Sequence, residues 1–310
     1  MATRGVRRGG LGLNVLISGS SGLVGSALLP VLTREGHAAI RLVRVPPRPG
    51  QSAVYWNPAA GELDSVGLEG TDAVIHLAGE SLLGRWSAEK KTRIRESRVR
   101  GTRILCEALA RLVHPPQVLL SASAIGYYGD RGEEILQEDS PPGTSFLASV
   151  CREWEAAAAP AVQQGIRVVQ LRSGIVLSPA GGALAKMLTP FRMGLGGIVG
   201  SGRQYMSWIA LDDLIEVILH ALRRDTLRGP VNAVSPTPVT NQEFTRTLGR
   251  VLSRPTILPM PAFAARLAFG EMAEELLLAS TRVEPARLQA SGYRFHYPEL
   301  EGALRHLLRA

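Results

Sequence analysis

Gly19-Ser20-Ser21-Gly22-Leu23-Val24-Gly25 connects a strand-like run, Asn14 to Ile17, to a helix-like run that begins at Ser26. A strand that turns sharply into a helix aims free backbone N–H groups at one point, where a pyrophosphate can bind. The glycines allow the turn, the close approach of a phosphate and the packing of the helix on the strand. We therefore predict a dinucleotide-binding turn, with an ordinary strand-to-helix turn as the alternative. The loop residues expected to contact the cofactor are Gly19, Ser21, Gly22, Leu23, Val24 and Gly25.

The end of the second strand indicates which dinucleotide is bound. An NAD site usually has an Asp or Glu about 20 residues beyond the glycines, which accepts a hydrogen bond from the ribose. The second strand is expected over 38–43, and no acidic residue occurs from Gly36 to Ala60. Val43 and Arg44 stand where the acid would be, and an arginine there can pair with a 2′-phosphate. The sequence therefore favours NADP(H) over NAD(H), and a solvated loop arginine is the alternative for Arg44.

Strands and helices alternate along the first part of the chain, which predicts an α/β fold with a doubly wound parallel sheet of the Rossmann type. Apolar runs predict strands over 14–18, 38–43, 53–56, 73–77, 117–121 and 167–172. Helices are expected between them over 22–35, 87–112 and 147–164. The fourth strand leads into Leu77-Ala78-Gly79, and small residues at a carboxyl strand edge permit the close approach of a ligand. These three residues therefore join the expected cofactor site.

The pattern changes after about residue 178, where a glycine-rich stretch opens at Gly181. Beyond it we expect a smaller C-terminal α/β region with helices that begin near 213, 241 and 299 and strands over 231–234 and 256–258. The expected division is a basic tail over 1–12, an NADP-binding Rossmann domain over 13–178 with parts of 203–235, and a substrate or C-terminal region over 179–202 and 236–310.

Composition excludes several classes of protein. The formal net charge of +8 is spread along the chain without a nucleic-acid-binding motif, so we expect no nucleic-acid partner. No apolar run approaches the roughly 20 residues that a membrane helix needs, so we expect no membrane partner either. Cys106 and Cys151 are too few for a disulfide framework, and no His or Cys cluster indicates a metal. These features fit a cytoplasmic protein with a small-molecule substrate, and they do not indicate its oligomeric state.

Several stretches resemble the extended short-chain dehydrogenase/reductase (SDR) superfamily. The glycine spacing, the Leu-Ala-Gly after the fourth strand and Arg98-Val99-Arg100-Gly101-Thr102 fit its layout. More closely, the chain resembles the nucleoside-diphosphate-sugar-epimerase-like family of the SDR39 type, with its small C-terminal domain. That resemblance rests on His76 to Glu80, Ser121 to Gly129, Val150 to Glu155, Arg172 to Leu177, Gly200 to Gln204 and Pro285 to Tyr293. It implies a Rossmann fold and NADP(H), and it says little about the reaction.

The chain departs from the superfamily at the acid/base pair. Reductases and epimerases of this group use Tyr-x-x-x-Lys, in which the lysine and the cofactor lower the tyrosine pKa from about 10. No tyrosine in this sequence has a lysine four residues later, and the resemblance places Leu147 and Cys151 at the two positions. The usual mechanism therefore cannot be carried over.

Other residues remain as candidates around the nicotinamide. The resemblance places Ser123 where the group has a Ser or Thr that binds the reacting oxygen, and Tyr127 and Tyr128 follow it. A turn serine and two core aromatics are the alternatives. Arg93 and Arg98, on the helix after the fourth strand, are expected to reach the cofactor or its turn, with solvated helix arginines as the alternative.

Two functions follow from these residues. The first is an NADP(H)-dependent oxidoreductase or epimerase with non-standard acid/base residues Ser123, Tyr127 and Tyr128. The second is a non-catalytic NADP(H)-binding protein that reports the state of the cofactor to a partner.

Overall fold

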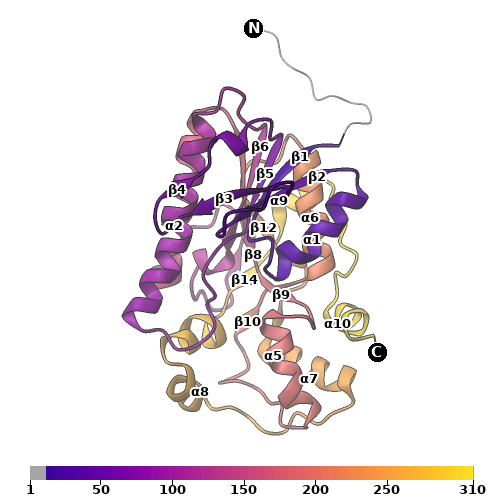
Figure 1. The fold of residues 1–310 in the computed structure, drawn as a ribbon. Coiled ribbons are helices and arrows are strands. Elements are labelled where there is room, and N and C mark those ends of the chain that lie inside the picture. Colours follow the sequence, from indigo (N-terminus) through magenta and orange to yellow (C-terminus); the bar gives the residue numbers. More distant parts are fainter. Residues whose placement is uncertain (1–11, 310) are drawn as a thin grey trace.

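An eight-stranded sheet forms the centre of the computed structural model, which describes residues 12–309 (Figure 1). The basic tail expected over 1–12 lies, except for Gly12, outside the described residues. In spatial order the strands are β12 (Gly229–Ala233), β8 (Arg167–Ser173), β6 (Val118–Ala124), β5 (Ala73–His76), β1 (Asn14–Ser18), β2 (Ala38–Val43), β3 (Ala53–Asn57) and β4 (Glu62–Leu63). All neighbours are parallel except β3 and β4. The doubly wound Rossmann-type sheet predicted from the sequence is confirmed.

The order of the strands defines the place where a ligand binds. From β1 the chain moves outward through β2, β3 and β4, and it then returns to the other side of β1 with β5. In an open parallel sheet, ligands bind beyond the carboxyl ends of the strands at such a switch point. The carboxyl ends of β1 and β5 are therefore the expected location of the site.

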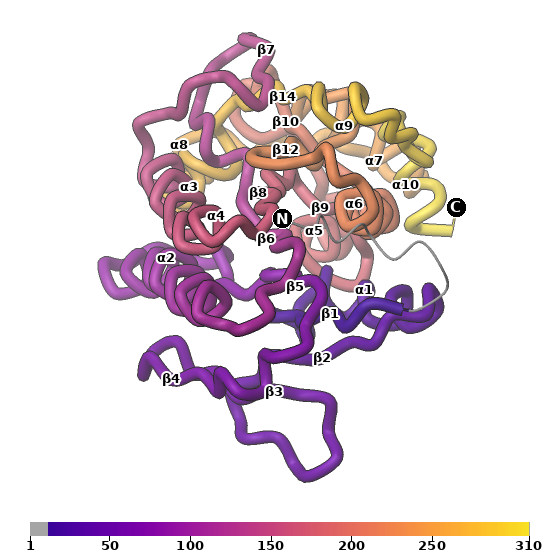
Figure 2. The backbone as a smooth tube through the Cα atoms, turned by 90° about the horizontal axis from the view of Figure 1, so that it is seen from above, coloured from indigo at the N-terminus to yellow at the C-terminus, as the bar shows by residue number. Residues whose placement is uncertain are grey.

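Helices cover both faces of the sheet (Figure 2). On one face, α1 (Leu23–Arg34) and α6 (Leu211–Arg223) contribute buried leucines and isoleucines to a core that includes Val15, Ile75 and Leu120. On the other, α2 (Ala88–Ala110) packs with α3 (Phe146–Ala156) and α4 (Ala159–Gln163). The prediction of a single helix over 147–164 is wrong. The chain forms two helices there: α3 ends at Ala156, and α4 has Pro160 in its first turn, where the missing N–H costs no hydrogen bond.

A second, smaller core lies beyond the sheet. It joins α5 (Gly182–Arg192), α7 (Asn241–Leu252) and α10 (Leu300–Leu308) through side chains such as Leu184, Phe244 and Leu304. The strand expected over 256–258 is wrong, because Pro255 and Pro259 lack the N–H groups that a ladder needs.

Short elements complete the fold. Three pairs of short strands are β7 (Ile135–Leu136) with β14 (Arg282–Val283), β9 (Ile175–Leu177) with β11 (Trp208–Ala210), and β10 (Tyr205–Met206) with β13 (Val239–Thr240). The short helices are α8 (Ala262–Phe269), a π-helix (Ala273–Leu278) and α9 (Ala286–Ala290). Two 3₁₀ turns are formed by Val66–Leu68 and Ile125–Tyr127.

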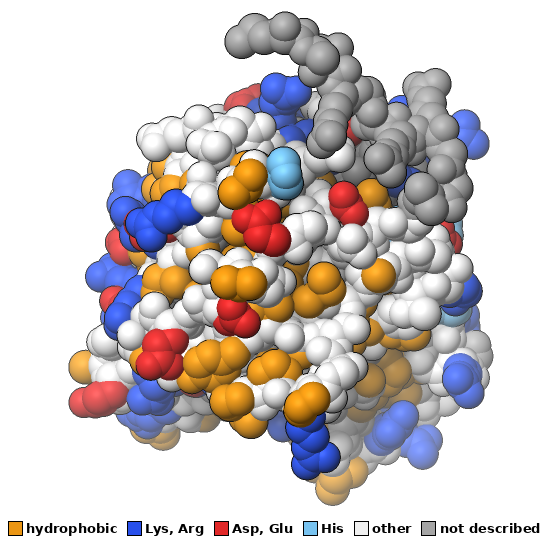
Figure 3. Space-filling view, turned by 45° about the horizontal axis from the view of Figure 1, so that its top comes forward, with side chains coloured by type: hydrophobic (Ala, Val, Ile, Leu, Met, Phe, Trp, Pro, Cys, Tyr) orange, Lys and Arg blue, Asp and Glu red, His pale blue; other side chains and the backbone are white. Residues whose placement is uncertain are grey.

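Two surface properties bear on partners. Within the described residues no helix is both long enough and apolar enough to cross a membrane. On the face drawn in Figure 3, basic side chains lie scattered around the margins among acidic and apolar ones.

Candidate functional site

The glycine loop between β1 and α1 has the shape that a pyrophosphate requires. Gly19 has φ +69°, a left-handed conformation that side chains rarely adopt. A Cβ on Gly25 would lie 2.3 Å from the Gly19 carbonyl oxygen, so only glycine fits there. A Cβ on Gly22 would meet only that same oxygen, at 3.3 Å, so Gly22 leaves open the space in front of the helix.

The N-terminus of α1 is free to bind an anion. Gly22 is its N-cap, no side chain caps it and its first turn has no acid. The first N–H groups of a helix have no partner within the helix, and the helix dipole favours negative charge beside them. Ser21 is exposed in front of this turn, and Leu23 packs against the Gly181 backbone. The glycine cradle and the uncapped helix therefore fit the pyrophosphate of a dinucleotide.

Val43 and Arg44 lie at the same edge of the sheet. Val43 ends β2, which pairs with β1, and Arg44 follows it as an exposed residue. Its side chain makes no hydrogen bond or ion pair to another residue of the described chain, 12–309. Arg44 thus directly follows the strand that pairs with β1, and a guanidinium is well suited to pair with a phosphate.

A buried histidine joins β1 to β5. Ser18 and His76 are paired residues of the two strands, and Ser18 Oγ lies 2.6 Å from His76 Nδ1. The same Oγ accepts hydrogen bonds from the backbone N–H groups of Leu77 and Ala78, at 3.1 and 3.2 Å. Because both acceptor positions of the hydroxyl are occupied, its proton must be donated to His76 Nδ1.

The other ring nitrogen fixes the protonation state of His76. Nε2 lies 3.0 Å from Thr102 Oγ1, which also accepts a hydrogen bond from Trp154 Nε1 at 2.9 Å. His76 is therefore neutral, with its proton on Nε2, by assignment from its partners. Complete burial lowers its pKa from 6.5 to about 4. This network holds the Leu77-Ala78 segment against β1.

Arg98 of α2 supports the next residues of that turn. Its Nη1 donates to the carbonyl oxygens of Glu80 and Ile94, at 3.0 and 3.2 Å. A Cβ on Gly79 would lie 3.3 Å from Arg98 Cζ, so the turn lies directly on the guanidinium, which also faces the Trp154 ring at 5.2 Å. Burial lowers the pKa of Arg98 from its ordinary value, and the turn carbonyls compensate for part of the lost hydration.

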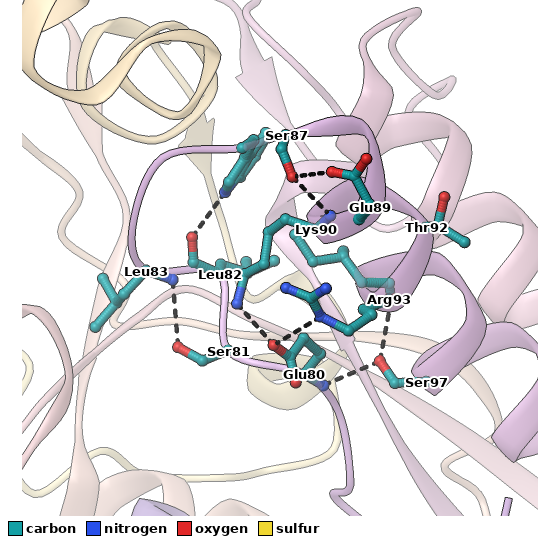
Figure 4. A network of polar contacts seen from close by, with 12 residues as sticks. Glu80, Ser81, Leu82, Leu83, Ser87, Glu89, Lys90, Thr92, Arg93 and Ser97 are labelled. Carbon is teal, nitrogen blue, oxygen red and sulfur yellow. Dashed lines mark hydrogen bonds and ion pairs between the residues drawn. The ribbon is translucent and has the colours of Figure 1, made fainter. Parts of the chain in front are cut away.

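Glu80 gathers further side chains of α2 around the same turn (Figure 4). Lys90 Nζ lies 2.7 Å and Arg93 Nε 3.8 Å from its carboxylate, and its backbone N–H donates to Ser97 Oγ at 3.0 Å. The hydrogen bond from Lys90 holds the pKa of Glu80 below its ordinary value. Arg93 and Arg98 therefore both reach the turn, Arg93 from the solvent side and Arg98 from beneath.

The structure places Ser123 in a buried charge network. Its hydroxyl donates to Glu155 Oε1 at 2.7 Å. Arg172 pairs with both oxygens of the same carboxylate, through Nε and Nη2 at 2.8 Å each. The register of the sheet sets Ser123 directly beside Arg172, at the carboxyl ends of β6 and β8.

The two tyrosines lie against the same arginine but differ in exposure. Arg172 Cζ lies 3.5 Å from the centre of the Tyr127 ring, and Tyr127 is partly exposed. Tyr128 is fully buried, donates to Asn232 Oδ1 at 2.7 Å and accepts from Arg172 Nη1 at 3.0 Å. Burial raises the pKa of Tyr128 to about 12. Of the pair, only Tyr127 has a surface that a ligand can reach.

Leu147 and Cys151, which occupy the positions of the missing Tyr-x-x-x-Lys pair, lie against the turn before Tyr127. A Cβ on Gly126 would lie 3.3 Å from Leu147 Cβ and 4.0 Å from Cys151 Sγ. Burial raises the pKa of Cys151 to about 12, and that of Cys106 likewise, so both remain thiols at neutral pH. No cluster of three or more His, Cys, Asp or Glu side chains suited to a metal occurs among residues 12–309.

Sequence reasoning missed the supporting residues of the site. They are Ser18, His76, Thr102, Glu155 and Arg172. Three of them are polar residues at the carboxyl ends of central strands: Ser18 and His76 end β1 and β5, and Arg172 lies one residue before the end of β8. A polar residue at the carboxyl end of a buried parallel strand was the available signal.

The fold, the glycine loop and the turn after β5 together define an NAD(P)-binding Rossmann protein. The NAD dependent epimerase/dehydratase family matches residues 15–233, and a domain of unknown function, DUF1731, matches 260–307. Epimerase family protein Mb2239 of Mycobacterium bovis is 45% identical over 291 residues, covering 94% of this chain and 96% of the relative.

Two solved structures agree with this placement. Human epimerase family protein SDR39U1, crystallised with NADPH, has a TM-score of 0.87 at 34% identity, and the match covers 96% of this chain and 99% of the human one. The nucleoside-diphosphate sugar epimerase of Corynebacterium glutamicum has a TM-score of 0.80 at 40% identity, covering 96% of this chain and 58% of that longer chain. The chain belongs to the NAD dependent epimerase/dehydratase family and, within it, to the SDR39U1 type.

Proposed function

We propose that this protein is an NADP(H)-dependent oxidoreductase or epimerase of the SDR superfamily. The observation that carries the choice of NADP(H) is Arg44, an exposed guanidinium beside the glycine loop, with no acidic residue from Gly36 to Ala60 to take its place. The NADPH in the crystal structure of human SDR39U1 supports the same choice. When bound, the cofactor supplies or accepts a hydride at its nicotinamide ring.

The chain's own residues divide into two binding groups. The glycine loop would hold the pyrophosphate, and the end of β2 would hold the adenosine end of the cofactor, with the Arg44 guanidinium on the 2′-phosphate and Val43 beside it. The second group lies at the turn after β5, where Leu77 to Gly79 provide a close-packed backbone surface that Arg98 and Arg93 fix from α2. The Ser18–His76 pair keeps this surface in register with the loop.

Ser123 and Tyr127 are the groups that we place at the reacting oxygen. Ser123 is 3% exposed and its hydroxyl donates to Glu155, so a substrate oxygen would have to reach it at the buried end of β6 and take over that hydrogen bond. No tyrosine of this chain has a lysine four residues later. The positive charge beside Tyr127 comes instead from Arg172, whose guanidinium lies over the Tyr127 ring. Tyr128 is a positioning residue, because its hydroxyl links Arg172 to Asn232 inside the core. The substrate class that suits this arrangement is a small molecule with a carbonyl or hydroxyl group.

Cofactor choice is tested by titrating the wild type with NADPH and with NADH in a calorimeter. Arg44→Asp should weaken NADPH binding about 10–100-fold, which corresponds to the loss of one charge-assisted hydrogen bond worth about 1.5–3 kcal/mol, and should spare NADH. Arg41→Asp, at an exposed arginine within β2, is the matched control. Equal affinity of the wild type for the two cofactors would contradict the proposal.

The binding loop and the chemistry need separate tests. Gly22→Val should abolish NADPH binding without unfolding the chain, because a side chain there enters only the open space before α1. A screen of carbonyl compounds and nucleotide sugars, followed by NADPH absorbance, should give turnover that falls in Ser123→Ala and Tyr127→Phe. Turnover that persists in both variants would remove these residues from the mechanism. Tight NADPH binding without any turnover would instead favour the non-catalytic binding protein.

A further inference from the structure

The end of the molecule formed by α5, α7 and α8, at the bottom of Figure 1, carries exposed apolar side chains that the cofactor site does not use. Two segments run side by side there, joined by backbone hydrogen bonds such as Met260 N–H to the Ile198 oxygen at 2.8 Å. The second segment continues into α8, which lies at this same end in Figure 1. We name the surface formed by residues 192–200 and 254–267 the basal ledge.

Large hydrophobic side chains are concentrated on the basal ledge. Phe263 and Leu267, one helical turn apart on α8, are 70% and 75% exposed. Of the thirteen large hydrophobic residues exposed within residues 12–309, seven lie on the ledge: Met193, Leu195, Ile257, Leu258, Met260, Phe263 and Leu267. Scattered exposed apolar residues are ordinary, but such a concentration marks an interaction site.

The segments that carry these apolar residues, and those next to them in the sequence, contain many more basic than acidic residues. The segments that build this end, 182–206 and 241–270, contain a single acid, Glu243, and that carboxylate is engaged in the capping box of α7. The same segments contain seven basic residues: Lys186, Arg192, Arg203, Arg246, Arg250, Arg254 and Arg266. Only Arg250 and Arg266 form ion pairs with acids elsewhere in the described chain.

Two acids that follow α8 are bound by residues of α2 and of the start of α3. Glu271 pairs with Lys91 at 2.7 Å, and Glu275 accepts hydrogen bonds from the backbone N–H groups of Phe146 and Leu147. The occupant of the ledge must therefore tolerate protruding apolar groups and supply negative charge. A second copy of the chain in a symmetric dimer would set the same positive surface against itself.

We propose that the basal ledge docks the protein on the surface of an anionic lipid bilayer. Phe263 and Leu267 enter the boundary between headgroups and acyl chains, as the apolar face of an interfacial helix does. The unpaired arginines and lysine face the lipid phosphates, each favoured by the negative surface potential. The sequence suggested no membrane partner because it contains no spanning segment; docking on a surface needs none.

Vesicle flotation of the full-length protein tests the proposal. At about 0.1 M salt, where surface charges are still felt over about 10 Å, the protein should float with phosphatidylcholine–phosphatidylglycerol vesicles and not with phosphatidylcholine alone. The double variant Phe263→Ser/Leu267→Ser should bind at least tenfold more weakly. Val66→Ser/Val113→Ser, at residues that are 82% and 78% exposed elsewhere, is the matched control and should bind like the wild type. Unchanged NADPH affinity and melting temperature show that the variants remain folded.

Several outcomes would overturn the proposal. One is no flotation with anionic vesicles, and another is equal flotation of the wild type and the Phe263/Leu267 variant, which would assign the binding to charge alone. A concentration-dependent dimer seen by light scattering, lost in that variant and unaffected by vesicles, would assign the ledge to a second copy. Binding of polyglutamate but not of vesicles, also lost in the variant, would assign it to an acidic protein.

Discussion

Acid should destabilise this protein through His76 in a way that one substitution can isolate. The neutral ring donates through Nε2 to Thr102 and accepts the Ser18 proton at Nδ1. A proton added at Nδ1 would face an Oγ that already accepts two backbone N–H groups. Protonation therefore breaks the network, and the folded state resists it: its pKa is about 4 against 6.5 for an ordinary histidine.

The sign and size of the effect follow from this shift. Between pH 6.5 and 4 the unfolded chain binds a proton at this residue that the folded chain does not, so stability falls as the pH falls through that window. At about 1.4 kcal/mol for each unit of pKa difference, the contribution of His76 amounts to about 3.5 kcal/mol. The stabilisation is fully present above pH 6.5 and lost by pH 4.

Urea unfolding at pH 7.5 and at a series of values down to 4 measures this loss. Acidic residues also titrate in this range, so the informative quantity is the difference between the wild type and His76→Gln. His114→Gln, at an exposed histidine, is the control and should follow the wild type. An equal loss of stability in the wild type and in His76→Gln would refute the reasoning. So would an NMR titration of the His76 ring with a midpoint near 6.5, which needs no variant at all.

Three other changes probe the site. Gly25→Ala should destabilise the protein by about 1–3 kcal/mol, measured by urea unfolding, because the new Cβ would lie 2.3 Å from a carbonyl oxygen of the loop. Glu155→Gln should lower the free energy of unfolding by about 3–5 kcal/mol, because it leaves the buried charge of Arg172 without its partner. The control Glu153→Gln, at an exposed ion pair of the same helix, should lower it by less than about 1 kcal/mol. A similar loss of stability in the two variants would contradict the argument. Neither of the two buried thiols should react with a thiol reagent at pH 8 until the chain is unfolded, and rapid labelling of the native protein would show that they are accessible.

The parts of the fold that the sequence predicted are those specified by local patterns. β1 and β2 agree with the expected ranges, because their runs of apolar residues are bounded by glycine or charged loops. The sequence did not predict the helix α5, because the glycines around it indicate a loop. Leu184, Leu188 and Phe191 nevertheless recur at helical spacing. Two-residue strands such as β7 depend on a partner more than a hundred residues away and leave no periodic signal.

The same distinction applies to the candidate site. The glycine loop and the lack of an acid after the second strand are short-range features that the sequence displays directly. The pairs Ser18–His76 and Ser123–Arg172 exist only because the register of parallel strands sets their members side by side. Registers of strands joined by long crossovers are not encoded in any short stretch, so these pairs became visible only in the folded chain.

The order of strands has a consequence for how the chain is made. Among the eight strands of the sheet, β1 comes first in the sequence, and it lies in the interior of the sheet. Each later strand joins an edge that already exists: β2, β3 and β4 extend one side, and then β5, β6, β8 and β12 extend the other. No strand has to be inserted between two that are already paired. A nascent chain can therefore build this sheet outward from its centre, adding the strands in the order in which they are translated.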